Sequence, residues 1–584
     1  MAAIITNKFR IHNAESYIEG FSESAATNVY LFIGRPQAWT DDNSPDTPKD
    51  TVSGEYYRWD DMIALKRVQS SDVTLAIPRR NWTSGKYYDI YKDNYNGVTA
   101  GVNIDSGAGT TPATLFNANF FVVTDEYNVY KCLANNDTAS AGGVGTTSTV
   151  KPTGTGSSII KTADGYQWKF MYQISAADAL KFVTPNYIPV QTVRLSNGYL
   201  ANTYDGSPGQ NQYDVETAAA SSGNGAIEVV HMTARGNNYY GESGALQAVT
   251  NSSTFKIQGS TFTADDMIVN NDIYFTSGTA QGLGGTIIDY VGSSKTVTIS
   301  ANGHSSAAGL TDGTGAAVTP GGTDSYVIGP KIVISGDGQG ANVRATVNAA
   351  GAINAITVVS GGNNYSNATI TVVSNTNQSS PQVNPTAATL TPVIGPAGGH
   401  GSDATKELGG YFVITNARLE YGESNNFTTN NDFRKVGLVA QPKYANGDYA
   451  SASVIDQATT IVLKSWNGTT YATDELVTGA TSGCTGRVVD FTGNNTLRLT
   501  DIIPSGNSTT SGYNGVYGYF TNTEVIAANT SPGGSGASAT ANGAGAVTGG
   551  DLTRFSGDVL YVENRSPVTR ASDQIEDIKL VIEF

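Results

Sequence analysis

The chain has 584 residues, of which 39% are hydrophobic and 14% charged, and its formal net charge is −16. This length allows several domains with separate cores, and the composition excludes a disordered polar chain. The sequence has no run of 18 apolar residues and no basic, apolar leader, which predicts a soluble protein made in the cytoplasm without membrane contact. The acidic balance disfavours nucleic acid as a partner, because phosphate binding depends on Lys and Arg.

Glycine and tyrosine are unusually frequent, with 67 and 31 residues. Glycine is typical of tight turns, and tyrosine packs well on strands. Because Val, Ile, Thr and Tyr alternate between the glycines, we expect many short strands joined by turns. The predicted fold class is mainly β, with few short helices.

Residues 1–205 have ordinary composition and are expected to form the N-terminal part of a β-sandwich. Asn13 and Ser175 are the expected caps of two short helices. The strands expected here and in the later ordinary segments are Asn28–Ile33, Phe120–Val123, Val129–Leu133, Gln167–Tyr172, Tyr411–Ala417, Val436–Ala440, Val559–Glu563 and Ile578–Phe584.

Residues 206–408 are poorer in charge and rich in Gly, Ser, Thr and Asn, which predicts an inserted block of β-modules. The block contains a repeat, because Gly225–Tyr239 matches Gly351–Tyr365 without a gap and both end in Gly-Asn-Asn-Tyr. Each copy predicts a strand followed by a turn that needs positive φ. Gly336–Gly340 is glycine-rich as well, but β alternation resumes after it, which favours a strand-turn-strand over a phosphate loop.

Residues 409–445 return to ordinary composition, 446–550 form a second expected insertion, and 551–584 supply the closing strands of the sandwich. Gly285–Gly292 and Gly486–Gly493 are similar, and each precedes another alternating run, which predicts a β-hairpin in each insertion. Residues 531–550 lack large apolar side chains and are expected to be a flexible linker.

Residues that carry catalytic or metal chemistry are scarce. The four histidines are isolated, and Cys132 and Cys484 are expected to be lone thiols, so we expect no metal, no cofactor and no catalytic residue. The acidic pairs Asp41-Asp42, Asp60-Asp61 and Asp265-Asp266 are expected to be solvated. The sequence therefore predicts a protein that is not an enzyme.

The densest basic and aromatic segment is Ile77–Trp82. Two arginines beside a tryptophan suit a desolvated contact with another subunit, because guanidinium groups bind carboxylates in a fork and stack on rings. The same residues could instead staple the fold internally. The sequence leaves these two interpretations open.

Several segments resemble one family. Leu31–Pro36 with Trp39, Ala76–Trp82 and Asp164–Trp168 are similar, in this order, to blocks of the baseplate wedge subunit called gene product eight in T-even-type contractile-tailed phages. Tyr561–Pro567, followed by Asp573-Gln574 and a last strand, is similar to the family's C-terminal block. The two insertions are departures from the compact family pattern and look like modules of cyanophage proteins.

The resemblance implies a structural subunit that links wedge proteins during assembly and sheath contraction. It also implies a homodimer, contacts with gene products six, seven and ten, and a place in the tail baseplate of the virion after assembly in the host cytoplasm. The residues expected at subunit contacts or fold-stapling positions are Arg35, Trp39, Arg79, Arg80, Trp82, Glu563, Asn564, Arg565, Asp573 and Gln574.

Two other classes of protein compete with this interpretation. A tail-associated protein that binds or depolymerises glycans would use the insertions as carbohydrate modules, and the many Tyr and Asn residues are compatible with it. A host-cell adhesin built of β repeats is disfavoured, because no secretion signal is evident.

Overall fold

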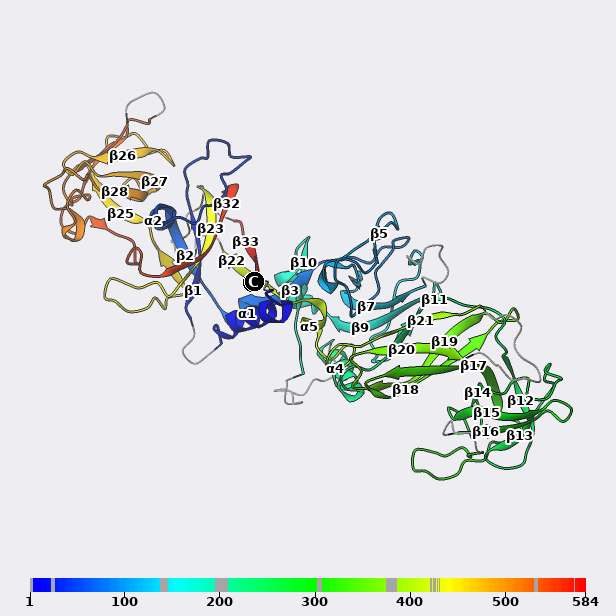
Figure 1. The fold of residues 1–584 in the computed structure, drawn as a ribbon. Coiled ribbons are helices and arrows are strands. Elements are labelled where there is room, and N and C mark those ends of the chain that lie inside the picture. Colours follow the sequence, from blue (N-terminus) through cyan, green and yellow to red (C-terminus); the bar gives the residue numbers. More distant parts are fainter. Residues whose placement is uncertain are drawn as a thin grey trace. The chain divides into compact units, whose positions relative to one another are not determined.

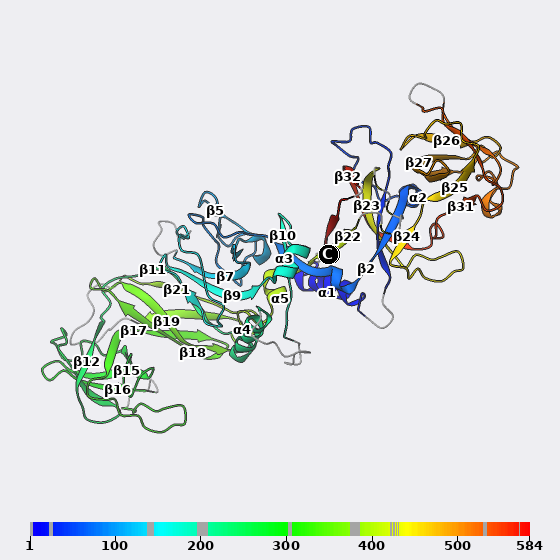
Figure 2. The same ribbon diagram turned by 180° about the vertical axis from the view of Figure 1, so that it is seen from behind.

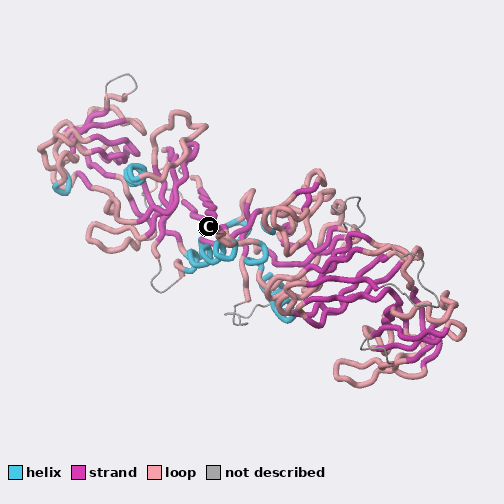
Figure 3. The backbone as a smooth tube through the Cα atoms, viewed as in Figure 1, coloured by secondary structure: helices cyan, strands magenta, loops and turns pink. Residues whose placement is uncertain are grey.

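The computed structural model describes residues 4–22, 27–136, 145–194, 208–301, 307–373, 386–420, 423, 427, 429, 431–529, 534–571 and 573–584. The chain forms two compact units, which are Met1–Ala76 with Tyr411–Phe584 (unit 1) and Ile77–Gly410 (unit 2). Strands dominate both units (Figure 3), so the protein is mainly β, as predicted. None of the helices among these residues is long and apolar enough to cross a membrane.

One sheet of unit 1 has the strand order β24-β2-β1-β23-β32. Both ends and the middle of the chain contribute to it, as the blue, yellow and red strands in Figure 1 show. Its central strand is antiparallel to both neighbours, so Leu31 lies opposite Lys66 and Leu438. The strands are β1 (Val29–Gly34), β2 (Met62–Val68), β23 (Asp432–Ala440), β24 (Val454–Asp456) and β32 (Asp558–Thr569).

A second sheet includes β3 (Val73–Pro78), β22 (Phe412–Leu419) and β33 (Glu576–Glu583), which are neighbours in this order. Val413 on β22 lies opposite Leu75 and Ile582. Buried side chains of both sheets, among them Leu31, Val413, Val436 and Leu580, form a single cluster. Unit 1 therefore contains a β-sandwich with pairings between distant parts of the chain. Of residues 1–205, which were expected to form its N-terminal part, only 1–76 belong to unit 1, and 77–205 belong to unit 2.

Two helices belong to unit 1, α1 (Asn7–Glu19) and α2 (Val52–Asp61). The cap of α1 is Thr6, whose hydroxyl accepts from the Phe9 N–H, so the prediction of Asn13 as the cap is wrong. Asn13 lies inside the helix, because the threonine provides an earlier cap. In unit 2 the other predicted cap is confirmed, since Ser175 begins α3 (Ala176–Phe182).

A closed β-barrel, called barrel B here, is inserted between β24 and β32 of unit 1. Its strands follow the order β28-β27-β26-β29-β30-β25, and β25 pairs with β28 to close the ring. They are β25 (Thr459–Lys464), β26 (Leu476–Gly479), β27 (Thr485–Thr492), β28 (Thr496–Ile503), β29 (Val525–Ala528) and β30 (Ser538–Ala541), and β31 (Val547–Thr548) pairs on β25.

The segment expected to be a flexible linker supplies part of the wall of barrel B through its residues 534–550, whereas 531–533 lie outside the described residues. Ala539 and Ala541 on β30 and Val547 on β31 are buried in the barrel core. The linker prediction is therefore wrong for these residues, because small side chains here fill a narrow core instead of marking mobility.

The N-terminal part of unit 2 is built around a sheet with the order β6-β7-β9-β8. Tyr130, Cys132, Trp168 and Phe170 from this sheet pack together with Val215 of a helix, α4. Cys132 and, in unit 1, Cys484 are free and buried. The elements are β4 (Gly101–Val102), β5 (Gly109–Thr110), β6 (Phe121–Val123), β7 (Asn128–Asn135), β8 (Ile160–Lys161), β9 (Tyr166–Gln173), β10 (Tyr187–Val190), α4 (Pro208–Ser222) and α5 (Ala404–Leu408).

The rest of unit 2 contains a second closed barrel, barrel A, with the order β12-β13-β16-β15-β14-β17 and closure between β17 and β12. Its strands are β12 (Glu242–Val249), β13 (Thr254–Ile257), β14 (Asn271–Phe275), β15 (Gly284–Val291), β16 (Thr296–Ser300) and β17 (Ser325–Gly336). The other strands of this part are β11 (Val229–Ala234), β18 (Gln339–Val347), β19 (Ile353–Asn363), β20 (Ala368–Val373) and β21 (Thr389–Val393). Figure 2 labels β11, β18, β19 and β21 in the reverse view.

The two Gly-Asn-Asn-Tyr repeats dock on each other. Gly225 and Gly351 have φ values of 64° and 73°, and each lies against the backbone of the tyrosine that ends the other repeat. Four hydrogen bonds are exchanged, from the N–H groups of Asn238, Tyr239, Asn364 and Tyr365 to the carbonyls of Ala350, Gly351, Asn224 and Gly225, respectively. The repeats therefore form a reciprocal pair related by a pseudo-two-fold axis.

The two predicted hairpins are confirmed as β15–β16 in barrel A and β27–β28 in barrel B. Both first strands carry a register shift at the same place, between Ile287 and Asp289 and between Val488 and Asp490. The repeated sequence therefore specifies a β-bulge as well as a hairpin. Gly336–Gly340 joins β17 to β18 as the expected strand-turn-strand.

Candidate functional site

The predicted contact residues fall into two groups. Arg35, Trp39 and Glu563–Arg565 lie in unit 1, whereas Arg79, Arg80 and Trp82 lie in unit 2. Asp573 and Gln574, also in unit 1, are exposed, and the Ala571 N–H donates to the Gln574 side chain over 3.3 Å.

Trp39 connects the loop after β1 to strand β32. The Arg35 guanidinium lies over the indole, 3.9 Å from the ring centroid, and the indole N–H donates to the Arg565 carbonyl over 2.9 Å. Arg35 has a φ of 56°, which turns the chain sharply at the end of β1. The side chain of Asn564 adds a bond of 2.6 Å to the Asp46 carbonyl. The loop is therefore fixed to β32 at two points, Trp39 and Asp46.

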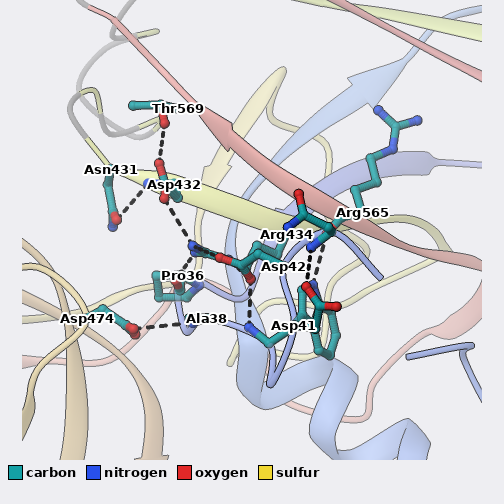
Figure 4. Close-up of polar contacts among 12 residues, drawn as sticks. Pro36, Ala38, Asp41, Asp42, Asn431, Asp432, Arg434, Asp474, Arg565 and Thr569 are labelled. Atoms are coloured by element: carbon teal, nitrogen blue, oxygen red, sulfur yellow. Dashed lines mark hydrogen bonds and ion pairs between the residues drawn. The ribbon is translucent and has the colours of Figure 1, made fainter. Parts of the chain in front are cut away.

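Arg434 on β23 is the centre of the polar contacts below this loop (Figure 4). Its guanidinium holds Asp42 in a fork, with Nε–Oδ1 at 3.0 Å and Nη2–Oδ2 at 2.9 Å. It also donates to Asp432 over 3.1 Å and to the Pro36 carbonyl. The Arg434 side chain is 7% exposed and the Asp42 side chain 30%, so the guanidinium of this charge-assisted fork is buried while the carboxylate partly faces water.

Asp42 is held ionised by its environment. The hydrogen bond from Arg434, together with the bond from the Trp39 N–H, lowers the pKa of this carboxyl below its usual value. The prediction that Asp41-Asp42 is simply solvated is wrong for Asp42. The same holds for Asp61, which is 4% exposed and forms an ion pair with Lys435.

Glu563 and Arg565 pair with each other along β32. The Arg565 Nε lies 2.8 Å from a Glu563 oxygen, and the Tyr561 hydroxyl donates to the same carboxylate over 3.0 Å. In Figure 4 the Arg565 guanidinium points away from the Arg434 contacts. The carbonyl of Arg565, not its charge, therefore holds the loop.

Arg79, Arg80 and Trp82 make contacts inside unit 2. Arg80 donates to the carbonyls of Phe116, over 2.9 Å, and Ala118, and its guanidinium lies 4.4 Å from the Phe121 ring centroid. Arg79 donates to the Thr184 carbonyl over 3.1 Å, and the Trp82 indole donates to the Ser148 hydroxyl over 3.1 Å. These contacts favour internal stapling, one of the two interpretations that the sequence left open.

A groove of about 730 Å³ runs beside the fixed loop of unit 1, and we call it the loop groove. It includes Trp39, Lys49, Tyr57, Arg58 and Asn564 in its lining. Tyr57, on α2, is 65% exposed. Two predicted contact residues, Trp39 and Asn564, thus border an open surface whose lining also includes Tyr57, three cationic residues (Lys49, Arg58 and Lys435) and one acidic residue, Asp46.

Sequence reasoning missed Asp42, Asp432 and Arg434. The one available signal was the Arg434-Lys435 pair inside an otherwise apolar strand, because charged residues rarely enter such a strand unpaired. Among the residues that the structure describes, no three His, Cys, Asp or Glu side chains gather as a metal site would require.

Comparison with known proteins gives two findings. Residues 3–205 match the family model described as Bacteriophage T4, Gp8. The baseplate wedge protein gp8 of Enterobacteria phage T4 is 26% identical over 218 residues, an alignment that covers 32% of this chain and 60% of that protein. The resemblance to the gene product eight family is thereby confirmed for the N-terminal part of the chain.

Proposed function

We propose that this chain is a structural subunit of a phage tail baseplate wedge, because residues 3–205 match the Gp8 family model. The family match is the observation that carries the proposal. In this role the chain links neighbouring wedge proteins during assembly and sheath contraction, without catalysis. By the same resemblance it acts as a homodimer, contacts gene products six, seven and ten, and resides in the virion baseplate after assembly in the cytoplasm.

The mechanical demands of a baseplate support this role. A subunit that transmits force needs surface loops that keep their shape, and the Arg434–Asp42 fork and the Trp39–Arg565 bond hold the loop after β1 on a sandwich. Charge-assisted forks are stronger and more directional than single neutral hydrogen bonds. The loop can therefore present the same surface before and after a neighbouring protein moves.

The loop groove is the contact surface that we propose for another wedge protein. Its lining combines exposed Tyr57 with the cationic side chains of Lys49 and Arg58. Interfaces are enriched in Tyr, Trp and Arg, because these side chains bury much area and still form polar bonds. Trp39 and Asn564 keep their predicted contact role in this proposal, as the rigid wall of the groove.

The division into host segments and insertions is a further part of the proposal. Host segments 1–205, 409–445 and 551–584 would carry the baseplate role, while 206–408 and 446–550 would be decorations. The family match, which ends at residue 205, supports the first boundary.

Co-expression with the other wedge proteins of the same phage tests the proposal. The full chain should co-purify with at least one tagged wedge protein and should sediment alone as a dimer. Tyr57→Asp should reduce co-purification at least tenfold, because it places a carboxylate in the contact. Tyr517→Asp, at a tyrosine of similar exposure (68%) outside the loop groove, should change nothing.

A wild-type chain that co-purifies with no wedge protein would overturn the proposed function. Equal effects of Tyr57→Asp and Tyr517→Asp would overturn the loop groove as the contact surface and leave the baseplate role standing.

A further inference from the structure

A second groove, in unit 2, lies where the two repeats face each other. The first and second repeats run antiparallel along β11 and β19. Besides the four turn bonds, one more backbone hydrogen bond joins them at each end, from the Ile227 N–H to the Gly361 carbonyl (2.8 Å) and from the Ile353 N–H to the Arg235 carbonyl (3.1 Å). Between these bonds, β11 pairs with β21 and β19 pairs with β18, and no ladder joins β11 to β19 among the described residues. The repeats thus hold one edge of β11 beside one edge of β19 without pairing the two strands in a sheet.

These strand edges and the end of the β8–β9 hairpin line a groove of about 660 Å³. A second hollow of about 550 Å³ shares Glu228, Ser360 and Gly361 with it, so the two are continuous. Together their linings follow β19 from Asn354 to Asn363, so the combined hollow, called the repeat groove here, suits an extended chain better than a small molecule.

The lining of the repeat groove is cationic in a chain of net charge −16. Its cationic side chains are Lys161, Lys169 and Arg235 against a single carboxylate, Glu228, and His231 also lines it. Hydroxyl and amide side chains such as Gln167, Asn354 and Thr357 fill the spaces between them. A ligand that matches this lining carries negative charge and many groups that form hydrogen bonds.

Glu228 adds a more specific requirement. One of its carboxylate oxygens, Oε2, is buried and has no hydrogen-bond donor in the structure. The buried ammonium groups of Lys131 and Lys169 interact electrostatically with this carboxylate. A buried anionic acceptor is costly to leave unpaired, so a ligand that donates hydrogen bonds gains most here.

We propose that the repeat groove binds a strand of acidic polysaccharide, a function separate from the baseplate role. Sugar hydroxyls donate to Glu228 Oε2, and the carboxylates of the polymer pair with cations such as Lys161, which is exposed at the mouth of the groove. The combination of a carboxylate acceptor with surrounding cations matches a polymer that has both hydroxyl and acid groups. A purely anionic polymer satisfies the cations and leaves Glu228 unpaired.

Titration calorimetry on the full chain tests the proposal, with alginate oligosaccharides as the acidic glycan, dextran as the neutral glycan and poly-L-glutamate as the anionic peptide. Alginate should bind, and dextran should not. Lys161→Glu and Glu228→Gln should each weaken alginate binding at least fivefold. Lys406→Glu, at a lysine of unit 2 outside the lining, should have no effect.

The absence of alginate binding to the wild-type chain would overturn the proposal. Poly-L-glutamate binding as tight as alginate binding, unchanged by Glu228→Gln, would overturn it in favour of a peptide site or an unspecific anion surface. Thermal melting of each variant shows whether it is folded, and Lys161→Glu decides the outcome if Glu228→Gln does not fold. Co-purification with wedge proteins is independent of all these results.

Discussion

Barrels A and B have the same ring of strands but begin at different points of it. Strands β13 to β17 of barrel A can be matched in chain order with β25 to β29 of barrel B. Each matched pair of strands then has corresponding neighbours in its ring. The remaining strand comes first in barrel A, as β12, and last in barrel B, as β30. The two barrels are therefore circular permutations of one fold, which shows that strand pairing, not the position of the chain ends, defines the module.

The barrels also differ in how they join the rest of their units. The bulge residue of barrel B, Val489, is buried in the core of the sandwich, whereas its counterpart in barrel A, Ile288, is only partly buried. The Asn431 side chain donates to the Val489 carbonyl over 2.7 Å, and the Thr500 hydroxyl donates to the Asp60 carbonyl over 2.8 Å. Hairpin β15–β16 thus forms part of the wall of barrel A. Hairpin β27–β28 forms the same part of barrel B and also attaches this barrel to the sandwich of unit 1.

The largest expected effect tests whether β30, the strand that comes last in barrel B, is part of the barrel core. Ala539→Asp on β30 should lower the free energy of unfolding of unit 1 by about 4 kcal/mol, because it places an unpaired carboxylate in the core of barrel B. Thr540→Asp, at the half-buried neighbouring position, should cost less than about 1 kcal/mol. Thermal unfolding followed by circular dichroism measures both, and equal tolerance would restore the linker interpretation.

The anchor should be the next most sensitive feature. Val489→Ala should destabilise unit 1 by about 2–3 kcal/mol, because it removes two methyl groups from the sandwich core. Ile288→Ala removes more atoms from a less buried position, and we expect about 1 kcal/mol in unit 2. Denaturant titrations give both values. A larger loss at Ile288 would contradict the difference between the two barrels.

A hydrogen bond at the same junction should contribute less. Asn431→Ala should cost about 1–2 kcal/mol, because the buried Val489 carbonyl loses its donor from Asn431. Hydrogen exchange should then speed up along β27 and remain unchanged along β15, its counterpart in barrel A. Unaltered exchange along β27 would show that the apolar contact alone holds barrel B.

The smallest expected effect depends on pH. Burial, together with the nearby Asp61 carboxylate, raises the pKa of Asp501 on β28 from 3.8 to about 6. A carboxyl with a raised pKa in the folded state favours folding below about pH 4, and this contribution is lost as the pH rises through 6.

Asp501→Asn should therefore match the wild-type stability at pH 4 and exceed it by about 1 kcal/mol at pH 7, which is less than the full shift implies because the Asp501 side chain is still 23% exposed to screening water. Melting curves of the two proteins between pH 4 and pH 7 measure the difference. A variant that is less stable than the wild type at pH 7 would show that the charge of Asp501 is needed at this junction. Strand β16, the counterpart in barrel A, carries no carboxylate, so no such dependence is expected there.

Local sequence patterns predicted the strands and hairpins well. Alternation and turn residues act over a few positions, and this is why the hairpin at Gly285 and the cap at Ser175 are where they were expected. The linker prediction failed because Ala539 and Ala541 carry no pattern that separates a narrow core from a flexible chain.

The polar contacts could not be predicted for a different reason. Asp42 and Arg434 meet because β1 and β23 are neighbours in the sheet, and nothing in either local segment specifies its partner. The Gly-Asn-Asn-Tyr turns show the same limit, since their residues encode positive φ but not the second turn on which each one docks.

The reciprocal docking of these turns restricts which segments of the gene can be exchanged by recombination. A recombination event that transferred the segment around Gly225 without the segment around Gly351 would leave two tyrosine turns without the backbone that receives them. The barrel encoded between the repeats can be replaced, because the repeats close around its two ends. We therefore expect the two repeats to be inherited together, while the barrel between them can vary.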